Sequence, residues 1–205
     1  MIYASDHFVQ NDREQLFRLM RRNSFATFVS TPKGEPVITH VPALVDEKTN
    51  SLNRHVARPN SIWRNFGPDH ELPFIFQGPH HYIFPGWYTV QPSVPTWNYA
   101  VVHVKGRARV IDDQPGTESL VAELVQIHEA QLAPEWAMAL PAECMRQIFD
   151  GIVACEARIT HLQGKFKPSR IRSEGDRLNV IAALQENENP DAARVAALMS
   201  EMLES

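Results

Sequence analysis

Polar and basic side chains gather where a predicted strand ends, and they could hold a phosphate group. His55 and Arg58 close the extended run that begins at Ser51, and Asn60 or Ser61 is placed to cap a short helix that follows. Arginine forks and the N–H groups at a helix N-terminus both suit a phosphate. The alternative is an ordinary solvated strand end.

The nine histidines of the chain raise the question of a metal site. None belongs to an HExxH motif, and His128 and Glu129 are neighbours on a predicted helix, so they face different directions. We therefore predict no metal site. His40 and His55 lie on consecutive predicted strands and could line one pocket as cross-strand neighbours. Hydrogen-bonded histidines in a barrel wall are the alternative.

Aromatic residues are concentrated around a proline-rich loop at positions 85–95. Trp63, Tyr82, Trp87 and Trp97 could stack on a planar ligand or fill a dimer interface, where Trp and Tyr are enriched. The chain has no GxGxxG or GxxxxGK[ST] loop and no GxSxG turn. These absences disfavour Rossmann, P-loop and serine hydrolase sites.

The elements that must position these residues are mostly short strands. Extended runs are predicted at 24–31, 36–46, 51–58, 71–78, 80–86, 97–112 and 151–164. The first three read as an antiparallel meander. Helices are predicted at 11–22, 117–132, 141–150, 175–186 and 191–204, with a short one near 60–66. We expect one domain over 1–205, mainly β, with an N-terminal helix and a C-terminal helical extension at about 174–205.

Composition narrows the classes of function. The net charge of −4 provides no strong positive field, which disfavours direct nucleic-acid binding. No segment has the roughly 18 apolar residues needed to span a bilayer, and the N-terminus lacks the pattern of a signal peptide. We therefore expect a cytoplasmic protein with no membrane partner. Cys144 and Cys155 are predicted to be buried free thiols.

Several segments resemble successive blocks of the PaiB-like family of FMN-binding negative transcriptional regulators. They are FATFVS, THVPALVD, HVARPNSIW, FQGPHHYIFPGWY, PTWNYAVVHVKG, HEAQLAPEW and GKFKPSRIR, and the most specific are GPHHYIFPGWY and VPTWNY. This family is similar to pyridoxamine phosphate oxidases and flavin reductases. The resemblance implies a six-stranded antiparallel split β-barrel, and a homodimer that binds FMN in a groove at the subunit interface.

The resemblance also implies a set of cofactor-binding residues. They are Thr39, His40, Val41, Pro42, His55, Val56, Ala57, Arg58, Asn60, Trp63, Gln77, Gly78, Trp97, Asn98, Lys165 and Ser169. Four positions depart from the residues usual in the family: Arg54, Pro59, Ser61 and Ile171. No catalytic residue is assigned.

The resemblance supports three hypotheses about function. The first is an FMN-binding protein that acts as a flavin-dependent oxidoreductase, passing hydride or electrons between a nicotinamide or other small molecule and an acceptor. The second is a negative transcriptional regulator of the PaiB type that acts with or without flavin. The third is haem binding, which ranks last because no histidine is singled out as an axial ligand.

Overall fold

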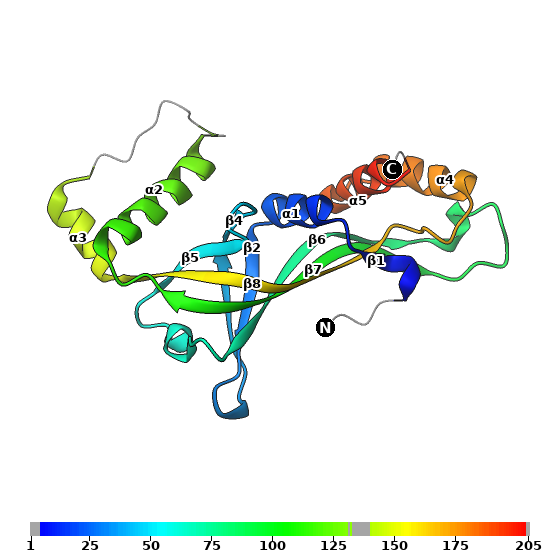
Figure 1. The fold of residues 1–205 in the computed structure, drawn as a ribbon. Helices are drawn as coiled ribbons and strands as arrows, with labels where there is room; N and C mark the ends of the chain where they lie inside the picture. Colours follow the sequence, from blue (N-terminus) through cyan, green and yellow to red (C-terminus); the bar gives the residue numbers. More distant parts are fainter. Residues whose placement is uncertain (1–4, 131, 133–139, 204–205) are drawn as a thin grey trace. The chain divides into compact units, whose positions relative to one another are not determined.

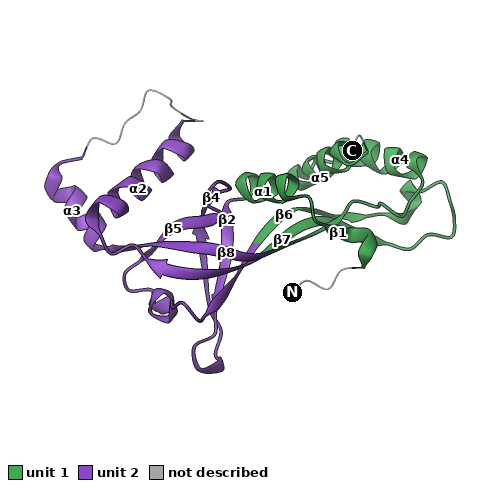
Figure 2. Cartoon of the chain, in the orientation of Figure 1, with its two compact units in different colours: residues 1–23, 76–103, 162–205 green, residues 24–75, 104–161 purple. Residues whose placement is uncertain are grey.

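The computed structural model describes residues 5–130, 132 and 140–203 (Figure 1). The chain folds as two compact units, coloured separately in Figure 2. Unit 1 comprises Met1–Asn23, Phe76–His103 and Leu162–Ser205, and unit 2 comprises Ser24–Ile75 and Val104–His161. Three long strands have residues in both units, and the single-domain organisation stays a prediction.

One sheet contains eight strands of the described residues, and its order is β3-β2-β6-β7-β8-β5-β4, with β1 paired to β8. The strands are β1 (Val9–Gln10), β2 (Phe25–Ser30), β3 (Val37–Pro42), β4 (Leu44–Asp46), β5 (Ser51–Ala57), β6 (Glu71–Ile83), β7 (Thr96–Val110) and β8 (Ile152–Lys167). The pairs β1–β8, β2–β3, β2–β6, β4–β5 and β5–β8 are antiparallel. Six of these strands have six or more residues, which is the number that the family resemblance implies, and the short β1 and β4 are additional. The two runs predicted at 71–78 and 80–86 form one strand, β6.

The predicted strand at 36–46 is divided at Ala43. Its first half, β3, pairs with β2, so that Thr27 lies opposite His40. Its second half, β4, pairs with β5, and β5 pairs on its other side with β8. The predicted three-stranded meander is therefore wrong, because β3 and β5 are not neighbours in the sheet. The hairpins β2–β3 and β4–β5, which the predicted meander contained, are both present.

Unit 2 contains helices α2 (Gln114–Glu129) and α3 (Ala142–Asp150) and the short turns η2 (Pro32–Gly34) and η3 (Ser61–Asn65). Leu120 and Leu124 of α2 pack with Leu44 of β4 and Ala154 of β8. This amphipathic contact fixes the helix on one face of the β4–β5–β8 strands. The predicted helix at 117–132 thus exists, but it begins three residues earlier and ends at Glu129.

Unit 1 contains η1 (Asp6–Phe8), η4 (Pro85–Trp87) and helices α1 (Arg13–Arg22), α4 (Glu174–Gln185) and α5 (Pro190–Glu201). Figure 1 shows α4 and α5 side by side, and their apolar residues form one buried cluster with Ile83 of β6. The Asp12 side chain accepts hydrogen bonds from the N–H groups of Glu14 and Gln15, which confirms the predicted start of α1.

The predictions for the two cysteines have different outcomes. Cys155 is buried as predicted, whereas Cys144 is exposed on α3, because that helix has no buried residue.

Among the described residues, no helix is long and apolar enough to cross a membrane.

Candidate functional site

The side chains of β7 that belong to unit 1 alternate between two faces of the strand. Trp97 is 52% exposed and Tyr99 is half-buried, whereas Asn98 and Ala100 are buried. Successive side chains of a strand point to opposite faces. The odd-numbered positions therefore define an open face, and the even-numbered positions point toward the helices.

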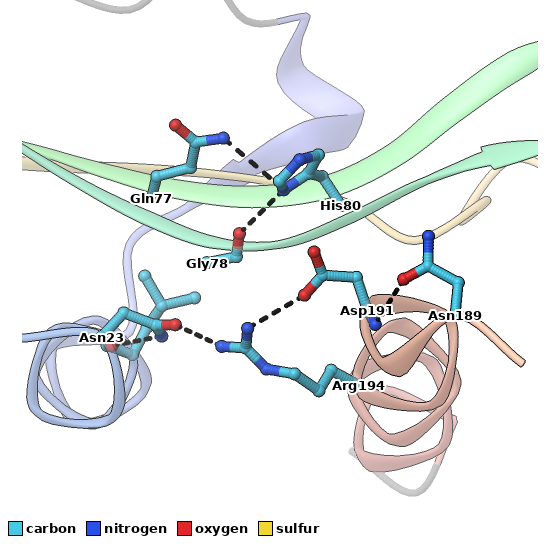
Figure 3. Close-up of polar contacts among 8 residues, drawn as sticks. Asn23, Gln77, Gly78, His80, Asn189, Asp191 and Arg194 are labelled. Atoms are coloured by element: carbon cyan, nitrogen blue, oxygen red, sulfur yellow. Dashed lines mark hydrogen bonds and ion pairs between the residues drawn. The ribbon is translucent and has the colours of Figure 1, made fainter.

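Aromatic rings gather on the open face. The Trp97 ring centroid lies 6.3 Å from that of His80 and 6.1 Å from that of Tyr82. Gln77 Nε2 lies 3.5 Å from His80 Nδ1, and Figure 3 shows both side chains on the side of the strand away from α1 and α5. We define the aromatic face as Gln77, His80, Tyr82, Trp97, Tyr99 and Lys165.

Two lysines of β8 lie beside aromatic rings in unit 1. Lys165 Nζ is 5.4 Å from the Tyr99 ring centroid. Lys167 Nζ donates a hydrogen bond of 2.5 Å to Thr96 Oγ1 and lies 5.9 Å from the Phe8 ring centroid. An ammonium group within about 6 Å of a ring centroid is attracted to the ring face. Lys165 therefore adds positive charge beside the aromatic surface of the open face.

Three predicted site residues lie on the helix-covered face instead. A Cβ atom at Gly78 would lie 3.0 Å from both Ala100 O and Leu19 Cδ1, so the absence of a side chain there serves the packing of α1. Asn98 Nδ2 donates to Ser169 Oγ at 3.0 Å, and both side chains are buried. Their contacts tie the strands to each other rather than face a ligand.

Arg58 of unit 2 is engaged by backbone carbonyls at the end of α3. Its Nε donates to Asp150 O at 2.5 Å, and its Nη2 donates to Ile152 O at 2.7 Å. Trp63 Nε1 in turn donates to the Arg58 carbonyl at 3.0 Å. A phosphate at Arg58 would have to compete with these two carbonyls.

Asn60 completes this network. Its Oδ1 accepts a hydrogen bond from the Ile62 N–H at 3.0 Å and so caps η3, as predicted. Its Nδ2 donates to Thr39 Oγ1 at 2.6 Å. The structure thus brings Thr39, Arg58, Asn60 and Trp63 together, and their polar groups largely satisfy one another.

His40 and His55 have different surroundings. His40 is exposed, and its Nδ1 lies 3.1 Å from Thr27 Oγ1. His55 is half-buried, and its Nδ1 is buried without a hydrogen-bond partner among the described residues. Desolvation lowers the pKa of His55, so the neutral imidazole is favoured. Because their strands do not pair, the predicted cross-strand contact between them is wrong.

The four remaining predicted residues differ in exposure. Val41 and Val56 are buried in the core, Pro42 is half-buried and Ala57 is exposed at the end of β5. Buried valines offer a ligand only their backbone groups.

The sequence did not lead us to assign His80 or Tyr99 to the site, and it indicated Tyr82 only as a ring that could stack on a planar ligand or fill a dimer interface. A signal was available, since 80 and 82 on one strand and 97 and 99 on the next share the period of two that places side chains on one face. Arg54 was noted only as a departure from the family, yet it is fully buried against Phe28 and Phe74.

Comparison with known proteins defines the family. Residues 2–161 match the family described as "Putative FMN-binding domain". The chain is also 33% identical to Protease synthase and sporulation protein PAI 2 of Bacillus subtilis (strain 168), over 98% of both chains. The chain belongs to this FMN-binding, PaiB-like family. The match confirms FMN as the cofactor of the domain.

Solved structures confirm the predicted split-barrel fold. The flavocytochrome Anf3 from Azotobacter vinelandii has a TM-score of 0.62 at 13% identity and covers 86% of this chain and 78% of its own. The FAD and Heme binding protein from Mycobacterium smegmatis has a TM-score of 0.59 at 16% identity, with 78% and 73% covered. At these identities the likeness shows the fold.

The groups on the aromatic face fit a phosphorylated flavin. Trp97 and His80 offer flat apolar surface for a planar ring, Gln77 offers an amide for ring heteroatoms, and Lys165 offers a cation for a phosphate. In unit 2, the unpartnered His55 Nδ1 is a further polar group that a ligand could satisfy.

Proposed function

We propose that this protein binds FMN on the aromatic face and works as a cytoplasmic, homodimeric flavin-dependent oxidoreductase. The observation that carries the proposal is the half-exposed Trp97 ring, held between His80 and Tyr82 on the open face of unit 1. An indole ring in an aromatic cluster usually is buried, and its exposure leaves a surface on which a second ring can stack.

Four residues of the aromatic face have distinct roles in this proposal. Trp97 and His80 orient the ring by stacking, and Gln77 donates or accepts a hydrogen bond at its edge. Lys165 attracts the phosphate through a charge-assisted contact. When bound, FMN supplies hydride and electron transfer between a nicotinamide or other small molecule and an acceptor.

Residues of unit 2 that the family resemblance implies stay predicted contacts. Thr39 and Asn60 already bond to each other, and Arg58 bonds to the end of α3. These three residues are therefore engaged within unit 2, and we assign the phosphate charge to Lys165 of unit 1. His55 of unit 2 differs from them, because its Nδ1 has no hydrogen-bond partner among the described residues.

A homodimer is supported by apolar side chains on the loop that leads into β7. Val90 and Val94 are 58% and 69% exposed, and Phe84 and Trp97 are also exposed. Apolar side chains clustered on an exposed surface mark interaction sites. A second copy of the chain would cover them and place the cofactor at the interface.

The flavin site is tested by titrating FMN, and separately riboflavin, with the protein and following the fluorescence of the flavin. We expect Trp97→Ala to weaken both ligands, by about 0.5–1.5 kcal/mol for the lost stacking. Lys165→Ala should weaken FMN more than riboflavin, by about 1.5–3 kcal/mol, because only FMN carries the phosphate. Lys48→Ala, in an exposed turn, is the matched control and should change neither.

Three results would count against the proposal. Equal losses of FMN and riboflavin affinity in Lys165→Ala would remove this residue from the phosphate site. No binding of FMN at high micromolar concentration, or a Soret band in the purified protein, would remove the flavin assignment. A monomer by light scattering would remove the shared interface.

The similarity to the PAI 2 protein favours a second function, negative transcriptional regulation of the PaiB type. We expect such regulation to act without direct DNA binding by this protein, because the 20 Lys and Arg residues are outnumbered by 24 Asp and Glu residues. Fluorescence anisotropy on promoter DNA at about 150 mM salt tests this. Saturable, sequence-specific binding in the nanomolar range would favour a direct regulator.

A further inference from the structure

A hollow between helices α1 and α5 of unit 1 plays no part in the proposed flavin site. Its volume is about 520 Å³, and it also reaches Pro79 of β6 and Phe166 of β8. Small-molecule sites typically measure roughly 300–1,000 Å³. All its lining residues belong to unit 1. It is therefore large enough for a small organic ligand.

The floor of the hollow is apolar and closely packed. Leu19, Phe166 and Met202 are buried and line it together with Pro79. Leu19 is held against β6, where a Cβ atom at Gly78 would lie 3.0 Å from its Cδ1. This packing leaves the floor little room to collapse, so an apolar body could settle on it without rearrangement.

The walls are joined by polar contacts at the end of α1. Arg22 Nη1 donates to Glu201 Oε1 at 2.8 Å. Arg194 of α5 donates to Asn23 Oδ1 at 2.6 Å and to Asp191 Oδ1 at 3.0 Å, as Figure 3 shows. These contacts hold the two helices together and also compensate the charges of both arginines.

One arginine that lines the hollow, Arg18, is not engaged by these contacts. Arg18 lines the hollow, one turn of α1 before Arg22, and it makes no hydrogen bond or ion pair with any residue that the structure describes. Its five N–H donors form a planar fork that matches a carboxylate. An uncompensated guanidinium above an apolar floor is complementary to a ligand with one negative charge and an apolar body.

We propose that this hollow binds a small organic monocarboxylate, with its carboxylate on Arg18 and its apolar body on Leu19 and Phe166. The site is separate from the flavin site, because Leu19 of α1 packs against Gly78 on the helix-covered face of β6, and Phe166 is buried. Its ligand therefore binds whether or not FMN is bound.

Isothermal titration calorimetry of the full-length protein with 4-phenylbutyrate and with its neutral counterpart 4-phenylbutan-1-ol tests the proposal. We expect the carboxylate to bind about tenfold more tightly than the alcohol, because only the carboxylate makes a charge-assisted contact. Arg18→Gln should abolish that difference. Arg21→Gln, an exposed arginine of the same helix that does not line the hollow, is the control and should preserve it.

A second variant tests the hollow itself. Ala197→Phe places a ring in the cavity from α5 and should abolish binding of both probes, while circular dichroism confirms that the variant is folded. Trp97→Ala should leave 4-phenylbutyrate binding unchanged, so failure of the flavin site and failure of this site give different results. Equal affinities for the two probes, no binding of either, or an unchanged preference in Arg18→Gln would overturn the proposal.

Discussion

The central carbon of the Arg54 guanidinium lies 4.4 Å and 4.5 Å from the ring centroids of Phe28 and Phe74, and these two rings stack on each other with their centroids 4.5 Å apart. Its Nη1 donates to Leu52 O at 3.3 Å, but its Nε and Nη2 are buried without a partner among the described residues. Burial lowers the pKa of Arg54, because the charged form is desolvated. Cation–π attraction only partly offsets that loss of hydration.

This environment predicts the effect of replacing Arg54 by an apolar residue of similar length. Arg54→Met should be at least as stable as the wild type, and more stable by up to about 4 kcal/mol, because it removes two unsatisfied donors without leaving a large cavity. Arg54→Ala should instead lose about 2–5 kcal/mol through the cavity it creates. Urea denaturation measures both. A loss of more than about 2 kcal/mol in Arg54→Met would mean that the rings stabilise the cation more than burial destabilises it.

At the scale of elements, the contact between α1 and β8 depends on a glycine. A Cβ atom at Gly164 would lie 2.2 Å from Leu16 Cδ2 and 3.2 Å from the carbonyl oxygen of Gln10. The Gln10 backbone cannot withdraw easily, because Gln10 pairs with Gly164 in the β1–β8 ladder. The missing side chain therefore allows the helix and strand to meet.

Substitution of two glycines separates this packing effect from backbone entropy. Gly164→Ala should destabilise the protein by about 1–3 kcal/mol through overpacking. Gly175→Ala, in the first turn of α4 with nothing within 4 Å of the added carbon, should stabilise it by about 0.4–1 kcal/mol. Thermal unfolding of the two variants measures the contrast. Similar melting temperatures for both would show that α1 shifts freely over β8.

The elements that could be predicted from the sequence are those with local causes. The start of α1 at Asp12 and the cap of η3 at Asn60 depend on side chains within three residues of the N–H groups they satisfy. The division of 36–46 at Ala43 was missed because the partner of β5 on its other side, β8, is about 100 residues away.

The same distinction applies to the candidate site. Alternation places Trp97 and Tyr99 on one face of β7, and His80 and Tyr82 on one face of β6, which a period of two could predict. Gln77 differs in parity from His80 and Tyr82, so this period does not predict its contact with His80. The carbonyls that engage Arg58 belong to Asp150 and Ile152, more than 90 residues away, and no local pattern predicts them. Predicted contacts that depended on such distant partners are the ones the structure changes.

At the scale of the whole molecule, family blocks along the chain predicted the split barrel, but nothing in them indicated two compact units. Each unit is assembled from two or three separate segments, so its boundaries follow from contacts between distant parts of the chain. Half-buried histidines occur in both units, with His55 in unit 2 and His103 in unit 1. The stability of the whole fold should therefore depend on pH through both.

Desolvation is the largest cause that lowers the pKa of both His55 and His103 below the ordinary value of 6.5. A lowered histidine pKa means that the unfolded chain takes up protons at a higher pH than the folded chain does. As pH falls through about 6.5, the unfolded state therefore gains protons first, and the free energy of unfolding decreases. Above that pH both states are neutral at these positions, and the stability is fully present.

We accordingly expect the free energy of unfolding to fall between about pH 7.5 and pH 5, and the His55→Gln, His103→Gln double variant to fall less steeply. His128→Gln, at an exposed position on α2, is the matched control and should keep the wild-type slope. Urea denaturation at a series of pH values gives the three slopes. If the double variant kept the wild-type slope, the pH dependence would have to arise from other groups, and the burial of these two imidazoles would contribute nothing to it.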